Sequence, residues 1–118
     1  MVLDKQGGPN WFKNWCVAPV IVDPDADEVY FTPIYYVMAH FSKFIRPEAK
    51  VIGLEGLESG LMAAAAQNPD GSTVIIVFNE TETPKSISLT LNEKNVEFSI
   101  DAQAIQTIVI PKEEIKFN

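Results

Sequence analysis

The segment Gly7–Trp15 combines residue types that bind sugars. It reads Gly-Gly-Pro-Asn-Trp-Phe-Lys-Asn-Trp and contains three aromatic residues, Trp11, Phe12 and Trp15. Flat aromatic faces pack against the C–H side of a pyranose ring, and the amide of Asn14 both donates to and accepts from hydroxyl groups. The segment therefore predicts a carbohydrate-contacting loop. Aromatic-rich loops also pack as lids, so the motif alone leaves a structural role open.

Residues 1–4 are predicted to end a strand, and Asp4–Pro19 form the loop that follows it. Glycine weakens both helix and strand, and proline removes a backbone donor, so the Gly-Gly-Pro run excludes regular structure. A brief apolar run, Val20–Val22, comes next and is stopped by the acidic turn Asp23–Asp27. The candidate loop is thus expected between two short strand-like segments.

A helix is predicted to begin at Pro33, with Thr32 as its N-cap, and to stop before Pro47. Apolar residues recur there at three- and four-residue spacing: Ile34, Val37, Met38, Phe41, Phe44 and Ile45. Such spacing marks one apolar face. One strand and one helix are too few to bury this apolar face between them. We therefore expect an exposed apolar patch on the order of several hundred Å² or a covering oligomer interface.

After Lys50 the pattern changes to period two with short spacing, which predicts strands at 50–57, 61–67, 73–79, 85–92, 95–100 and 104–111. Turn residues at 67–72 and 92–95 separate pairs of these strands. The predicted fold class is mainly β, an antiparallel β-sandwich preceded by one βα unit like the end of a (β/α)8 barrel. The expected division is 1–47 for the strand–loop–helix unit and 48–118 for the sandwich.

Composition excludes several function classes. A net charge of −7 argues against nucleic-acid binding, which needs a surface rich in Lys and Arg. The one basic cluster, Lys43, Arg46 and Lys50, lies at the predicted helix C-terminus, where cations are favourable in any case. The longest uncharged apolar runs, such as Val74–Phe78, are too short to form a transmembrane segment.

No cofactor or metal site is inferred. The acidic turn Asp23–Asp27 lacks the glycine and glutamate that an EF-hand requires at its sixth and twelfth positions, so a solvated turn is favoured. Cys16 is the only cysteine, and its one available base would be His40, on a different element. His40 is instead expected to be a packed, hydrogen-bonded helix residue.

In their order along the chain, the loop Gly7–Trp15, the segment Thr32–Tyr36 and the helix end His40–Pro47 resemble the C-terminal end of glycoside hydrolase family 30, the glucosylceramidase-like retaining β-glycosidases. That family has a matching Gly-Gly-Pro-Asn-Trp segment, whose following asparagine lines the sugar pocket. The resemblance implies that Asn14 contacts the sugar and that Trp15 is the adjacent aromatic of the loop.

Trp11 completes the set of predicted substrate-binding residues. Phe12 stands where the family more often has a smaller residue, which leaves its role open.

Retaining glycosidases act through two carboxyl groups, a nucleophile and an acid/base. The resemblance places these glutamates at the ends of barrel strands four and seven, neither of which is in this chain. The pair Asn79-Glu80 mimics the family's acid/base motif but follows a predicted sandwich strand, so a solvated turn is expected. Glu55, Glu58, Glu113 and Glu114 lack the pairing and apolar surroundings that raise a carboxyl pKa. No catalytic residue is predicted.

The leading hypothesis is the C-terminal part of a retaining β-glycosidase, glucosylceramidase-like or β-glucanase-like. Its substrate would be a β-glucoside or glucan, its partner the rest of the barrel, and its location secreted or periplasmic by family resemblance. The chain itself is expected to be inactive. The alternatives are a non-catalytic carbohydrate-binding module, with Trp11, Phe12 and Trp15 as the stacking platform, and a purely structural sandwich.

Overall fold

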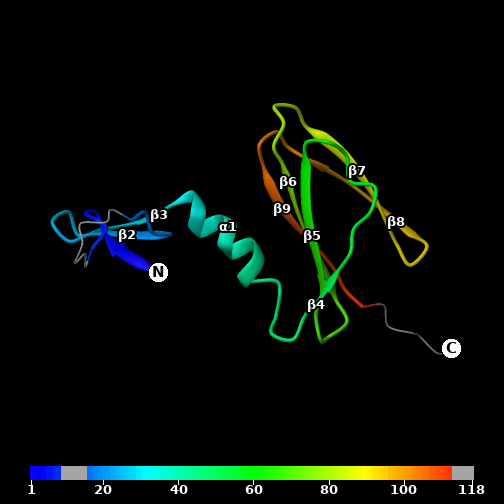
Figure 1. Ribbon diagram of the computed structural model, residues 1–118, viewed down its shortest axis with the longest axis horizontal. Helices are drawn as coiled ribbons and strands as arrows, with labels where there is room; N and C mark the ends of the chain where they lie inside the picture. Colours follow the sequence, from blue (N-terminus) through cyan, green and yellow to red (C-terminus); the bar gives the residue numbers. More distant parts are fainter. Residues whose placement is uncertain (9–15, 113–118) are drawn as a thin grey trace. The chain divides into compact units, whose positions relative to one another are not determined.

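The computed structural model describes residues 1–8 and 16–112. The chain divides into two compact units, Met1–Ala39 and His40–Asn118. Figure 1 shows the elements along the chain, from the short strands β1–β3 through the helix α1 to the strands β4–β9. No helix in the described part is long and apolar enough to cross a membrane.

Three short strands form the sheet of the first unit. β1 (Val2–Asp4) pairs in parallel with β2 (Val20–Asp23), which pairs antiparallel with β3 (Glu28–Phe31). The strand end predicted at residues 1–4 and the apolar run before the acidic turn are both present as strands. β3 is an element that the sequence did not predict. All four of its residues are exposed, so it lacks the alternation that marks a half-buried strand.

The helix α1 spans Pro33–Ser42. It begins at the predicted proline and ends before Pro47, although one further helix-like hydrogen bond of 2.9 Å joins the Ile45 N–H to the Phe41 carbonyl. No residue of α1 is buried. The large apolar side chains that are exposed on it include Ile34, Val37, Met38 and Phe41, whereas Phe44 and Ile45 of the predicted apolar face, just beyond α1, are half-buried.

The second unit is an antiparallel β-sandwich. Its larger sheet has the order β4-β5-β6-β9, formed by Lys50–Ile52, Leu61–Gln67, Thr73–Asn79 and Ile105–Ile110. The smaller sheet is the hairpin of β7 (Lys85–Leu91) and β8 (Lys94–Ile100). Figure 1 shows the hairpin beside the larger sheet, and its residues Ile87, Leu89 and Phe98 pack against the core. The mainly β fold class is thus confirmed, with a barrel-end portion ahead of the sandwich.

The sandwich core lies between the two sheets. Its buried residues are Leu61, Ala65, Ile75, Val77 and Ile100. The hairpin contributes further apolar residues at every second position, among them Ile87 and Leu89. This period-two pattern buries one face of the hairpin and leaves the other in water, as an antiparallel sheet of this kind requires.

β6 is one of the two inner strands of the larger sheet and is buried on both faces. Its consecutive residues Val74, Ile75, Ile76 and Val77 are each no more than 3% exposed. The sequence of a strand that is buried on both faces is a continuous apolar run and does not alternate between apolar and polar residues. This explains why the sequence located β6 at its observed bounds.

One predicted strand is too long. The sequence suggested a strand at 50–57, but β4 ends at Ile52. Gly53 follows directly, and Gly56 adopts a positive φ of 71°, a conformation that strand residues do not use. Residues 53–60 therefore form a connection that brings the chain to β5.

Candidate functional site

The three predicted substrate-binding residues, Trp11, Asn14 and Trp15, lie outside the described residues. Their positions are therefore untested, and the same holds for Phe12. The structure does describe the two ends of the segment that carries them: Asp4–Gly8 on one side and the residues from Cys16 on the other.

Asp4, the last residue of β1, organises the start of this loop. Its Oδ1 atom accepts hydrogen bonds of 2.9 Å from the backbone N–H groups of both Gln6 and Gly8. Its carbonyl accepts a third, of 3.0 Å, from the N–H of Gly7. Gly7 is buried with a φ of 73°, which a residue with a side chain rarely adopts. The loop therefore leaves β1 through a turn closed around one carboxylate.

Lys5 connects this turn to the turn that follows β2. Its Nζ lies 3.0 Å from Asp23 Oδ1 and 2.7 Å from Asp25 Oδ2. The hydrogen bond to Asp25 contributes most to a raised pKa of Lys5, and Asp23 adds to it. In return, Lys5 lowers the pKa of the Asp23 carboxyl. Both aspartates therefore hold the lysine in its charged form.

The sequence did not single out Asp4 or Lys5. The role of Asp4 was readable in principle, because an aspartate that precedes a Gly-Gly pair often bonds backbone N–H groups a few residues ahead. The role of Lys5 was not readable. It depends on the parallel pairing of β1 with β2, which aligns Asp4 with Val22 and brings the acidic turn alongside.

The other end of the loop is also fixed. Ala18 is completely buried. The hydroxyl of Thr32 lies 3.2 Å from the Ala18 carbonyl and 3.0 Å from the Pro19 carbonyl, and the Thr32 N–H donates to Pro19 at 2.9 Å. Thr32 occupies the N-cap position, as predicted, and also holds the chain that returns from the loop.

The structure also describes the other residues whose side chains could take part in catalysis or metal binding. His40 Nδ1 lies 2.8 Å from Thr107 Oγ1, which confirms the predicted hydrogen-bonded role. Cys16 is exposed. Glu80 is exposed in the connection after β6. Within residues 1–8 and 16–112, no group of three His, Cys, Asp or Glu residues could hold a metal ion.

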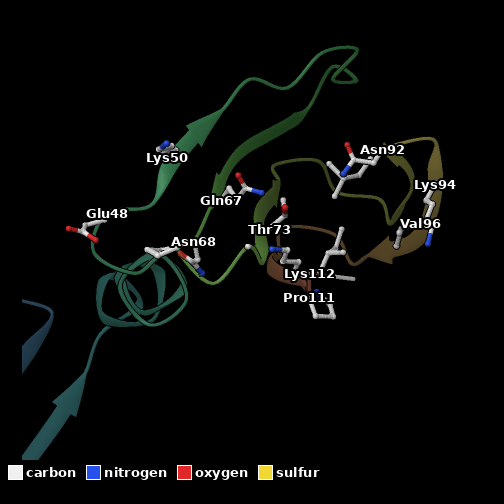
Figure 2. Close-up of a pocket in the computed structure, with 14 residues that line it drawn as sticks. Glu48, Lys50, Gln67, Asn68, Thr73, Asn92, Lys94, Val96, Pro111 and Lys112 are labelled. Atoms are coloured by element: carbon white, nitrogen blue, oxygen red, sulfur yellow. The ribbon is translucent and has the colours of Figure 1, made fainter. Parts of the chain in front are cut away.

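A separate groove of about 790 Å³ opens within the second unit, at the end of the sandwich. Figure 2 shows Lys50 on one side of it and Lys94 on the other, with Gln67, Thr73 and Lys112 between them. Glu48 is the single carboxylate among the described residues that line it. Hydrolysis with retention needs two carboxyl groups, and the described lining residues supply one.

Comparison with protein-family models decides the family. Residues 1–45 match the glycosyl hydrolase family 30 TIM-barrel domain, and residues 48–108 match the glycosyl hydrolase family 30 beta sandwich domain. The chain belongs to glycoside hydrolase family 30. The loop that carries Asn14 thus falls in the part that matches the barrel domain, and the groove lies in the family 30 sandwich unit.

Family 30 relatives match nearly the whole chain. It is 36% identical to lysosomal acid glucosylceramidase of Mus musculus, over 83% of this chain and 19% of that protein. It is also 36% identical to putative glucosylceramidase 1 of Caenorhabditis elegans, over 93% of this chain and 23% of that protein. The crystal structure of SrfJ from Salmonella typhimurium superposes with a TM-score of 0.88 at 26% identity, covering 95% of this chain and 25% of that one.

The chain thus spans about a quarter or less of the length of these relatives. It corresponds to a small portion of a family 30 glycosidase, comprising a barrel-end segment and the sandwich.

Proposed function

We propose that this chain supplies one substrate-contacting loop and the accessory β-sandwich of a retaining, glucosylceramidase-like β-glycosidase. The observation that carries the proposal is the start of the Gly-Gly-Pro-Asn loop, which the structure describes as far as Gly8. It directly follows the carboxyl end of β1, within the segment that matches the family's barrel domain. Active sites of (β/α)8 enzymes are built from the loops at the carboxyl ends of the strands.

The catalytic step of such an enzyme is a double displacement. One carboxylate attacks the anomeric carbon while a carboxylic acid protonates the leaving oxygen, and water then releases the glycosyl-enzyme intermediate. The family resemblance assigns both groups to barrel strands four and seven. Asn14 would contact a sugar hydroxyl, with Trp15 and Trp11 beside the ring. The family also favours a secreted or periplasmic enzyme.

The open apolar residues of the first unit fit this proposal. Tyr35, Tyr36, Val37 and Met38 on α1 are between 38% and 56% exposed. An exposed apolar surface of this kind marks a contact with other protein. The remaining strands and helices of the barrel would cover it.

Two measurements test the proposal. The purified 118-residue chain, incubated with an aryl β-glucoside, should give no turnover above background. In a full-length enzyme that contains this chain, Asn14→Ala should lower kcat/KM by about 10–100-fold, because an oriented hydrogen bond to the substrate is lost. Asn95→Ala, at an exposed position of β8, is the matched control and should leave kcat/KM within twofold.

Two outcomes would contradict it. Turnover by the isolated chain that disappears when one of its own residues is mutated would place catalysis within these 118 residues. Saturable binding of glucosides by the isolated chain, measured by calorimetry and lost in Trp15→Ala, would favour a non-catalytic carbohydrate-binding module.

A further inference from the structure

We propose that Asp4 is a positioning residue for the substrate-contacting loop, and that Lys5 fixes the turn built on Asp4 to the sheet of the first unit. The inference rests on the proposed function for its consequence in catalysis. Its structural basis lies entirely in described residues. Asp4 acts through the turn at Gln6–Gly8, from which the chain continues to Asn14.

The geometry shows how one carboxylate holds the turn from which the loop begins. Asp4 Oδ1 accepts the N–H of Gln6 and the N–H of Gly8, each at 2.9 Å. The backbone closes the same turn a second time, with Asp4 N–H to Gly8 carbonyl at 3.4 Å and Gly7 N–H to Asp4 carbonyl at 3.0 Å. Both ends of the Gly7-Gly8 pair are therefore tied to the final residue of β1.

Lys5 gives the turn an external anchor. Its side chain spans to Asp23 at 3.0 Å and Asp25 at 2.7 Å, while its N–H donates to the Val22 carbonyl at 3.2 Å. The aspartates are themselves held in place, since Asp23 Oδ1 accepts the N–H groups of Asp25 and Ala26 at 3.1 and 3.3 Å. Lys5 and Asp25 are exposed and Asp23 is only partly covered, so we expect these ion pairs to restrain the local turn without adding much to global stability.

The position of a substrate contact depends on such anchoring. A displacement of about 1 Å at a residue that orients the substrate can cost up to about 100-fold in rate. A Gly-Gly pair has wide backbone freedom, and only the contacts around it select one conformation. The carboxylate of Asp4 supplies two of these contacts through a single oxygen atom.

That single oxygen makes the first test selective. Asp4→Asn retains an Oδ1 acceptor in the same place, whereas Asp4→Ala removes it. In the 118-residue chain, Asp4→Ala should raise the amide hydrogen-exchange rate of Gly8 by about tenfold, and Asp4→Asn should leave it within about threefold. Lys5→Met should raise the exchange rates of the turn, while Lys85→Met, which removes the ion pair of Lys85 with Glu58 in the sandwich, should not. Unchanged Gly8 exchange in Asp4→Ala would overturn the inference, whatever the enzyme does.

The second test measures function in a full-length enzyme. Asp4→Ala should lower kcat/KM for an aryl β-glucoside by about tenfold, through the same parameter, KM or kcat, that Asn14→Ala changes. Asp4→Asn should restore most of it. The double variant should lose less than the product of the two single effects, because both act on one contact. Full additivity, or a loss in Asp4→Ala that Asp4→Asn does not restore, would overturn the positioning role.

These outcomes separate the two proposals. If Asn14→Ala leaves kcat/KM unchanged, the proposed function of the loop fails. If Asn14→Ala lowers it and Asp4→Ala does not, only the positioning role of Asp4 fails.

Discussion

The side-chain oxygen of Asn68 accepts a 2.9 Å hydrogen bond from the backbone N–H of Arg46, a residue 22 positions earlier in the chain. The amide nitrogen of Asn68 donates to the Phe44 carbonyl at 2.9 Å and to Ser72 Oγ at 3.2 Å. Asn68 is only 7% exposed. One side chain in the β5–β6 turn therefore satisfies both a donor and an acceptor of the segment that leads from α1 to β4.

We predict that Asn68→Ala lowers the free energy of unfolding by about 2–3 kcal/mol. The substitution removes the hydrogen bonds of Asn68 with the Arg46 N–H, the Phe44 carbonyl and Ser72 Oγ, and each such bond contributes about 0.5–1.5 kcal/mol. Urea unfolding followed by circular dichroism measures the change. Asn95→Ala, which removes an exposed hydrogen bond with Thr90, is the control and should change the free energy by less than about 0.5 kcal/mol. Equal effects of the two variants would show that Asn68 does not hold the two segments together.

The strands of the sandwich were largely readable from the sequence, because their signals are local. β6 carries a continuous apolar run, β7 alternates, and turn residues bound both strands. β3 was missed because its four residues are all exposed, so it shows no alternation, and its pairing with β2 is visible only in the structure. The network of Asn68 could not be predicted either. It joins residues far apart in sequence, and only the folded turn brings them together.

The same distinction applies to the candidate site. Asn14, Trp15 and Trp11 could be proposed from residue type and family resemblance, and their arrangement stays a prediction. Asp4 and Lys5 emerged only from the structure. The bonds of Asp4 are local, to Gln6, Gly7 and Gly8, and could in principle have been read from the sequence. The partners of Lys5 lie in the acidic turn after β2, about twenty residues away, and only the folded sheet brings them together.

The β7–β8 turn contains a residue whose backbone is unfavourable for its type. Asn92 and Glu93 have φ values of 49° and 67°, and together they form the two-residue connection of the hairpin. Asparagine tolerates a positive φ, whereas glutamate is disfavoured there relative to glycine. We predict that Glu93→Gly raises the free energy of unfolding by about 0.5–1 kcal/mol. Thermal unfolding by calorimetry measures it.

The control for this prediction is Glu97→Gly, at an exposed position within β8. Glycine weakens a strand interior, so this variant should lose about 0.5–1 kcal/mol. If both variants lose stability, the positive φ of Glu93 does not destabilise the turn, and the prediction is wrong.

Asp70 gives the sandwich a defined dependence on pH. Its Oδ1 accepts hydrogen bonds from the Ser72 hydroxyl at 2.6 Å and the Ser72 N–H at 2.8 Å. These bonds, the hydroxyl first, lower the pKa of Asp70 below its ordinary value of 3.8. Between the lowered and the ordinary value, the unfolded chain binds more protons than the folded one. Stability therefore rises with pH in this window.

The stabilisation from Asp70 should be fully present at neutral pH and should disappear as the pH falls through 3.8 and below. Asp70→Asn retains the acceptor oxygen but does not titrate. We predict that the urea midpoint of the native chain falls more between pH 7 and pH 3 than that of Asp70→Asn. Glu97→Gln controls for the loss of one negative charge from the sandwich. Parallel pH profiles for the native chain and Asp70→Asn would refute the assignment.

Asn79 and Glu80 are adjacent but have opposite surroundings. Asn79 is fully buried. Its nitrogen donates to the carbonyls of Thr83 at 2.8 Å and Asp101 at 3.0 Å, and its oxygen accepts from the N–H and hydroxyl of Thr81 at 3.0 and 2.7 Å. Glu80 is exposed. The Asn-Glu pair that resembles an acid/base motif is therefore a structural asparagine followed by a solvated glutamate.

This contrast predicts that substitution of the asparagine lowers stability and that substitution of the glutamate leaves activity unchanged, unlike in a catalytic Asn-Glu pair. Asn79→Ala should lower the free energy of unfolding by about 2–4 kcal/mol, because the four hydrogen bonds of this fully buried side chain are lost, each worth about 0.5–1.5 kcal/mol. Glu80→Gln should change it by less than about 0.5 kcal/mol and should leave kcat of a full-length enzyme within twofold. Urea unfolding of the chain and steady-state hydrolysis of an aryl β-glucoside measure the two effects. A loss of activity by orders of magnitude in Glu80→Gln, with the fold intact, would restore Glu80 as an acid/base candidate, because removing a general acid that protonates the leaving group has that consequence.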